Sequence, residues 1–160
     1  MTPLKLLPLK EFQNRQKSIE TVESLAITAS MMSIKSESDE KKKKAKECKE
    51  NGNKSFQKKK YEEAENFYSE GLQLHPGFRQ LWTNRAICRN TMRKYQDAIS
   101  DCDSALSIDP KCSKSMIQKG NAYLGLGLFD DAKVCYESLR SMGQENEANT
   151  YLKKLENAQV

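Results

Sequence analysis

Three stretches of the sequence decide the fold: YEEAENFYSEGLQLHP at residues 61–76, YQDAISDCDSALSIDP at 95–110 and FDDAKVCYESLRSMGQ at 129–144. Each begins with an aromatic residue and has an alanine three positions later, and the starting positions 61, 95 and 129 are evenly spaced. A fixed period of roughly 34 residues indicates a solenoid, in which one supersecondary unit is repeated and each copy packs only against its neighbours. Because solenoids hold partners along a curved surface, the period predicts a binding protein.

Working outward from these stretches, the period defines three repeats at residues 45–78, 79–112 and 113–146. In each repeat, two apolar-periodic segments with helical spacing are separated by a short connection. Pro76 and Pro110 end the first two units, because proline cannot continue a helix. We therefore predict an all-α fold, a superhelix of three helix–turn–helix repeats.

Small residues recur at one phase of the predicted first helices, where Gly52, Ala86 and Gly120 are separated by one period each. A glycine inside a helix costs about 1 kcal/mol relative to alanine. Its return at the same phase predicts that a bulky side chain from the second helix fills the space left by the missing Cβ.

The two ends of the chain do not follow the period. Residues 147–158 carry an apolar stripe at i, i+3, i+4 and i+7, and we predict a capping helix that covers the open edge of the third repeat. Residues 1–40 are expected to be either partly disordered or one amphipathic helix. The polar stretch 33–40 is predicted to be a linker. The four lysines at 41–44 are predicted to form a basic linker into the first repeat.

The positive charge of the chain is concentrated in one segment. The 160 residues carry a net charge of +5, and residues 41–60 alone hold ten basic and two acidic side chains. This lysine-rich segment could contact RNA, acidic lipid or an acidic partner, which leaves a basic tether as a third hypothesis. No aromatic platform or nucleic-acid motif accompanies it, so solvated charge is favoured, and neither a nucleic-acid nor a membrane partner is expected.

Catalytic and metal-binding chemistry is not expected. The chain has five cysteines without a Cys-x-x-Cys pair and a single histidine, so a zinc set or a Ser/His/Asp site cannot be assembled. We expect neither an enzyme nor a cofactor. The absence of a secretory signal and of an apolar run of about 20 residues favours a cytoplasmic protein with reduced thiols.

The repeats closely resemble the tetratricopeptide repeat, whose signature is Trp-x-x-Leu-Gly-x-x-Tyr, then Ala-x-x-x-Phe, then Pro. The second repeat has Trp82, Ala98 and Pro110 at signature positions, and the third has Gly120 and Tyr123. The tryptophan and leucine positions of the first and third repeats depart from the signature. The resemblance covers residues 45–158 and implies protein–protein binding.

A narrower resemblance concerns the co-chaperone modules of this family, which grip the C-terminal carboxylates of heat-shock chaperones with a carboxylate clamp. Carried onto this chain, the clamp positions are Lys49, Asn53, Asn84, Lys114 and Gln118. The family has arginine at the last position, and glutamine has no charge with which to replace it. Ile87 and Asn121 are expected to line the same groove.

Two readings stay open for these residues. The first is a cytoplasmic, monomeric adaptor that binds the C-terminal peptide of a heat-shock chaperone through a partial clamp. The second treats the match as inherited family pattern, so that the protein is an assembly scaffold that binds another protein through its concave groove without clamp chemistry. The strings YSEGL, WTNRA and DPKCSK resemble a longer family member implicated in cytoplasmic dynein-arm assembly, which gives one example of such a scaffold.

Overall fold

The computed structural model describes residues 9–158, and every regular element in that range is an α-helix. The helices are α1 (Leu9–Gln57), α2 (Tyr61–Leu74), α3 (Arg79–Thr91), α4 (Tyr95–Ile108), α5 (Ser113–Gly125), α6 (Phe129–Ser141) and α7 (Glu145–Ala158). The chain divides into two compact units, residues 1–40 and 41–160, which are described separately. The expectation for residues 1–8 lies outside the described range. The all-α prediction is confirmed.

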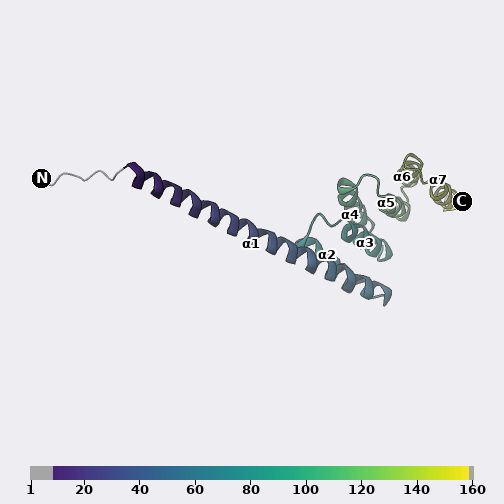
Figure 1. Ribbon diagram of the computed structural model, residues 1–160. Coiled ribbons are helices and arrows are strands. Elements are labelled where there is room, and N and C mark those ends of the chain that lie inside the picture. The colour runs from purple at the N-terminus through teal and green to yellow at the C-terminus, as the bar shows by residue number, and fades with distance from the viewer. Residues whose placement is uncertain (1–8, 159–160) are drawn as a thin grey trace. The chain divides into compact units, whose positions relative to one another are not determined.

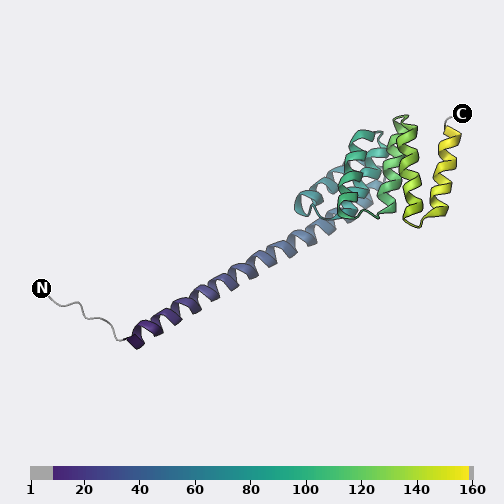
Figure 2. The ribbon, with the colours of Figure 1, turned by 90° about the horizontal axis from the view of Figure 1, so that it is seen from above.

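In the second unit, the helices keep the period found in the sequence. Helices α3 and α5 begin at Arg79 and Ser113, and α2, α4 and α6 begin at Tyr61, Tyr95 and Phe129, again one period apart. Each helix from α2 to α6 packs against the next one along the chain. Figures 1 and 2 show this succession, which ends at the yellow α7. The first helices of the second and third repeats, α3 and α5, also pack against each other, and the end of α1 serves as the first helix of repeat one.

The connections inside the three repeats share one backbone geometry. Lys59, Arg93 and Gly127 have φ values of 60°, 61° and 75°, at the same place in each connection. The following residue donates its N–H to a carbonyl of the last helical turn, for example Lys94 N to Arg89 O at 2.8 Å. This is the glycine-type helix ending, which caps orphan carbonyls. Only the third repeat has the glycine that adopts this conformation without strain.

The recurrent small residues pack where the sequence predicted a bulky partner. A Cβ added to Gly52 would lie 2.4 Å from the ring of Tyr68, and one added to Gly120 would lie 2.4 Å from the ring of Tyr136. Both tyrosines are buried. In the middle repeat, the alanine at the same phase is matched by a smaller residue of the second helix, Cys102, at the position equivalent to the two tyrosines. The predicted filling of the space is confirmed for both glycines.

Helix α7 closes the third repeat. Ala148 and Leu155 are buried in the same apolar cluster as Tyr136, and the Tyr151 ring stacks on the Tyr136 ring with centroids 5.2 Å apart. The helix begins at Glu145, two residues before the predicted segment, directly after a turn in which Gly143 has a φ of 78°. The amphipathic stripe read from the sequence is the face that packs on the repeat.

Around residue 40, the structure differs from the expected linkers. Residues 33–44 lie inside α1, which is continuous from Leu9 to Gln57. This stretch has no glycine or proline, and its acidic residues precede lysines by four positions, as in Glu37–Lys41 and Glu40–Lys44. That order of charges favours a helix, and the polarity that indicated a linker is equally compatible with a solvated helix.

Large apolar side chains are exposed along residues 9–34 of α1. Nine of them have exposed fractions between 58% and 76%: Leu9, Phe12, Ile19, Val22, Leu25, Ile27, Met31, Met32 and Ile34. Their directions are spread around the helix, so the moderately amphipathic helix expected here is only weakly one-sided. Within residues 9–158, no helix is apolar over a length that could cross a bilayer.

Candidate peptide-binding groove

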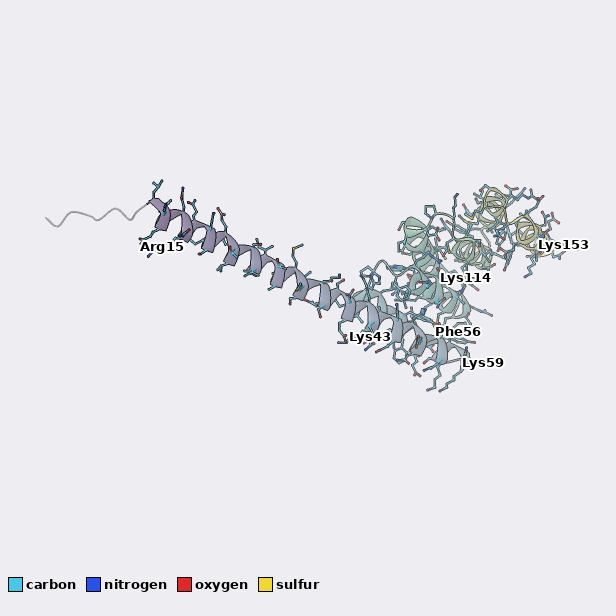
Figure 3. The ribbon with its side chains drawn as sticks, viewed as in Figure 1. Arg15, Lys43, Phe56, Lys59, Lys114 and Lys153 are labelled. Carbon is cyan, nitrogen blue, oxygen red and sulfur yellow. The ribbon has the colours of Figure 1, made fainter. Side chains whose placement is uncertain are left out.

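One cavity of about 270 Å³ lies among the first helices of the three repeats. Its lining residues come from four helices: Asn53, Phe56 and Gln57 from α1, Tyr68 from α2, Asn84 and Ile87 from α3, and Lys114 from α5. Phe56 near the end of α1 and Lys114 on α5 are labelled in Figure 3. The cavity combines amide groups, an aromatic hydroxyl, apolar surface and a cation. Such a mixture suits a short peptide with both polar and apolar side chains.

The structure brings four of the seven predicted residues into this cavity, namely Asn53, Asn84, Ile87 and Lys114. They come from all three repeats and are therefore far apart in sequence. They meet because the repeat places the first helices next to one another with the same face exposed. Lys49, Gln118 and Asn121 do not line this cavity.

The side chain of Asn53 is held by two donors. The hydroxyl of Tyr68 donates to Asn53 Oδ1 at 2.8 Å, and Nδ2 of Asn84 donates to the same oxygen at 3.0 Å. Burial, with a smaller contribution from Cys88, raises the pKa of Tyr68 to about 12, so the hydroxyl keeps its proton at neutral pH. Since the Asn53 oxygen is occupied, its amide N–H groups are left as the donors for a ligand.

The two predicted cations have different surroundings. Lys114 is exposed at the cavity wall. Lys49 is half-buried, and its ammonium group lies 5.2 Å from the centroid of the Phe78 ring. It lies four residues before Asn53 on α1, so the two side chains share one face of the helix. The cation–π contact holds the Lys49 stem beside the groove while leaving the ammonium group its hydrogen-bond donors.

Gln118 and Asn121 follow Lys114 by one and two turns of α5, on the same helix face. The side-chain amide of Asn90 on α3 donates to the Gln118 backbone carbonyl at 2.9 Å and to Gln118 Oε1 at 3.1 Å. The hydroxyl of Tyr136 donates to Asn121 Oδ1 at 2.9 Å. Both predicted residues are therefore tied to the repeat scaffold through their oxygen atoms.

Three cavity residues were missed by the sequence reading: Phe56, Gln57 and Tyr68. Phe56 and Gln57 follow Asn53 by three and four positions, so helical spacing alone could have placed them on the same face. Tyr68 is the bulky second-helix side chain that the small residue at position 52 predicts, and the sequence reading gave it no role in binding. Its hydroxyl reaches the groove because the facing glycine, Gly52, lets the ring cross the first helix closely.

A buried ion network stands behind the groove and links the first repeat to the second. Arg85 makes a two-pronged contact with Asp101 at 2.7 and 3.0 Å, and Arg89 bridges Asp101 at 3.0 Å and Glu65 at 2.7 Å. Lys94 also contacts Glu65 at 2.7 Å. Burial would raise the pKa of Glu65, but hydrogen bonds from Lys94 and Arg89 outweigh it and lower that pKa. None of the three cations of this network lines the cavity.

All five cysteines are buried and unpaired. Burial is the main cause that raises the pKa of Cys88 and Cys135 to about 11, and it raises that of Cys102 as well. Thiols of this kind stay protonated and are poor nucleophiles. Cys48 and Cys102 are small residues of the apolar core. Among residues 9–158, no cluster of histidine, cysteine and acidic side chains could hold a metal ion.

The sequence and the structure both match known proteins. A family model described as tetratricopeptide repeat matches residues 113–139. Mouse tetratricopeptide repeat protein 12 is 37% identical over 99 residues, which are 62% of this chain and 14% of the mouse protein. The likeness to a longer relative that was read from the sequence strings is therefore confirmed for the repeat region alone, and this chain matches about one seventh of that relative's length.

Solved structures match about three quarters of this chain. The first tetratricopeptide repeat domain of Spaghetti (RPAP3), bound to the HSP90 peptide SRMEEVD, matches with a TM-score of 0.69 and 34% identity, over 73% of this chain and 94% of that one. The second such domain of human RPAP3, in complex with the HSP70 peptide SGPTIEEVD, has a TM-score of 0.67 and 28% identity, over 74% and 98%. With its helix pairs, its constant period and these matches, the chain belongs to the tetratricopeptide repeat family.

Proposed function

We propose that this protein is an adaptor of the co-chaperone type, which binds the acidic C-terminal peptide of a heat-shock chaperone in the groove. The observation that carries the proposal is the cavity itself. Asn53, Asn84, Ile87 and Lys114, four residues chosen from the sequence, line one space with room for a few side chains. Support also comes from the homologous domains of RPAP3, which are solved with HSP90 and HSP70 peptides bound.

The chemistry of the lining fits an acidic chain end. A peptide that ends in aspartate presents two carboxylates, and Lys49 and Lys114 can each make a charge-assisted hydrogen bond to a carboxylate. The N–H groups of Asn53 donate to a carboxylate or to a backbone carbonyl of the peptide. Ile87 and Phe56 provide an apolar wall for an aliphatic side chain such as the valine of SRMEEVD.

The affinity should be lower than that of a groove with a full set of cations. Gln118 stands where the family's clamp has arginine, so one charge-assisted contact is replaced by a neutral one. Hydrogen bonds to charged groups contribute about 1.5–3 kcal/mol and neutral ones about 1 kcal/mol. The difference corresponds to a loss of roughly threefold to thirtyfold in affinity, which leaves specific binding in place.

Calorimetric titration of the full chain with the peptide SRMEEVD tests the proposal. We expect saturable binding that weakens as salt is added, because the contacts include ion pairs. Replacing both groove lysines, Lys49→Ala with Lys114→Ala, should weaken binding by at least tenfold. Absence of binding by the unchanged protein, or equal binding by the double variant, would contradict the proposal.

The matched control removes two lysines elsewhere on the repeats. Lys54 and Lys133 are exposed and do not line the cavity, so Lys54→Ala with Lys133→Ala lowers the net charge by the same amount. This control should bind the peptide almost as well as the unchanged protein. A loss equal to that of the groove variant would mean that general charge, and not the groove, attracts the peptide.

The scaffold function remains the second candidate, and the exposed apolar side chains of residues 9–34 favour it. A helix with this much unburied apolar surface is suited to pack against another protein. This function predicts a non-chaperone partner whose co-purification survives the Lys49→Ala and Lys114→Ala changes. Loss of every partner in that double variant would count against it.

A further inference from the structure

Helices α3 and α5 are joined by a side-chain amide, that of Asn90, whose orientation is determined by the fold. Nδ2 of Asn90 lies 2.9 Å from the Gln118 backbone carbonyl, which can only accept a hydrogen bond. The Asn90 group facing α5 must therefore be its NH₂. The same nitrogen lies 3.1 Å from the end of the Gln118 side chain, so that end must be the oxygen Oε1. Both amides are fixed in one orientation, which leaves the NH₂ group of Gln118 without a role in this contact.

This arrangement lowers the stability that Asn90 could otherwise provide. Its own carbonyl oxygen, Oδ1, is buried and has no hydrogen-bond partner among the described residues. A buried unpaired acceptor lowers the stability of the fold, and an apolar side chain of the same size would avoid that loss. An amide at position 90 is thus poorly explained by folding stability alone. Its two donated hydrogen bonds, both to Gln118, are the feature that an apolar residue could not reproduce.

The same arrangement occurs at two other predicted site residues, Asn53 and Asn121. Tyr68 and Asn84 occupy the oxygen of Asn53, and Tyr136 occupies the oxygen of Asn121. In all three cases a donor from the scaffold takes the amide oxygen, so the NH₂ group remains for a ligand. Asn53 lines the cavity, and Gln118 and Asn121 share the α5 face with Lys114, which also lines it. At these three positions, on α1 and α5, a scaffold donor takes the amide oxygen. At Asn84, which also lines the cavity, the scaffold contact takes the NH₂ group instead.

We propose that Asn90 is a positioning residue that turns the Gln118 NH₂ toward the groove, where it donates to an acceptor oxygen of the bound peptide. The neutral amide takes the place at which a cation would otherwise stand. The ligand class that follows is an acidic peptide contacted at this point through a backbone carbonyl or one carboxylate oxygen, with one fewer ion pair. This inference rests on the proposed peptide-binding function and specifies how one position of the groove serves it.

The test uses the full chain, the peptide SRMEEVD and the variants Asn90→Leu, Gln118→Leu and their combination. Leucine at 90 keeps the volume and removes the unpaired oxygen, so the variant should unfold at the same or a higher urea concentration. Each single change should weaken binding roughly fivefold, the effect of one neutral hydrogen bond. Because Asn90 acts through Gln118, the double variant should be no weaker than either single one. Additive losses, or full affinity in Asn90→Leu, would overturn the inference.

Gln118→Arg provides the opposite change. With a cation at this place, the peptide should bind more tightly at low salt, and its affinity should fall more steeply as salt is added. A slope equal to that of the unchanged protein would contradict a neutral contact at this position.

A measurement on the unchanged protein avoids dependence on the variants' folding. In an NMR titration with SRMEEVD, both side-chain amide protons of Gln118 should shift as the peptide binds. Peptide binding without any change in these resonances overturns the inference and leaves the proposed function intact. If SRMEEVD does not bind at all, the proposed function fails and this inference fails with it, so the two failures are distinguishable.

Discussion

The middle repeat and the two outer repeats build the same helix pair in different ways. In the outer repeats, Gly52 and Gly120 admit a tyrosine ring from the second helix, and the tyrosine hydroxyl emerges at a groove asparagine. The middle repeat has Ala86 with Cys102 and an isoleucine at the corresponding groove position. At this position, the two outer repeats thus place a polar side chain and the middle repeat an apolar one.

The middle repeat lacks the tyrosine of the outer repeats, and an ion pair joins its two helices. Arg85 and Asp101 join α3 to α4 by a buried two-pronged ion pair, and the equivalent positions are Asn51 with Phe67 and Lys119 with Cys135 in the other repeats. Core and groove are therefore not independent in this protein. Changing the packing residue of a repeat also changes which hydrogen-bond donors orient its groove.

The largest effect is expected from breaking the ion pair of the middle repeat. Asp101→Asn leaves Arg85 and Arg89 without their buried counter-charge, and removing one partner of a buried pair costs about 3–5 kcal/mol. Urea denaturation followed by circular dichroism measures this change. The matched control is Asp103→Asn on the exposed side of α4, which should cost less than about 1 kcal/mol although it also faces a lysine. Equal losses of stability in both variants would mean that the buried ion pair contributes no more to stability than the exposed one.

A smaller effect should follow when the outer repeats are made to resemble the middle one. Gly120→Ala places a Cβ against the Tyr136 ring, and overpacking of this kind costs about 1–3 kcal/mol. The same alanine should be tolerated, or even stabilise the helix by about 1 kcal/mol, in a protein that already carries Tyr136→Cys. The urea midpoints of the two single variants and the double variant measure this coupling. Additive losses would show that the glycine and the tyrosine are not a packing pair.

The smallest effect tests the link between core and groove. Tyr136→Phe keeps the ring and removes only the hydrogen bond to Asn121, which should cost about 0.5–1.5 kcal/mol. Tyr68→Phe should cost less, since Asn84 still donates to Asn53 in that variant. Thermal unfolding of the two variants side by side gives the order. The reverse order would contradict the assigned roles of the two hydroxyl groups.

Much of the fold was predictable because its determinants are local. The constant period, the proline stops at the ends of two repeats and the small residues facing bulky ones are all visible in the sequence. The linker at residues 33–44 was expected from polarity alone. Helix α1 continues through it, because charge order and the absence of helix breakers outweigh polarity in a solvated helix.

The site was predictable in part. The repeat period and the family resemblance selected Asn53, Asn84, Ile87 and Lys114, and the fold brings these four into one cavity. Lys49, Gln118 and Asn121 have the correct helix phase but lie outside the cavity lining. The position of a residue in the helical repeat determines the face of the helix on which it lies. Whether it also lines the cavity depends on how closely the neighbouring helices pack.

By itself, the sequence determined the all-α repeat architecture, the spacing of the repeats and the face of each helix that bears the predicted polar site residues. These properties depend on spacing along one chain segment. Only the tertiary structure decided which atom of each amide faces a ligand. That choice depends on donors such as Asn90, Tyr68 and Tyr136, which are distant in sequence from the amides they contact and come within hydrogen-bond distance only after the helices pack.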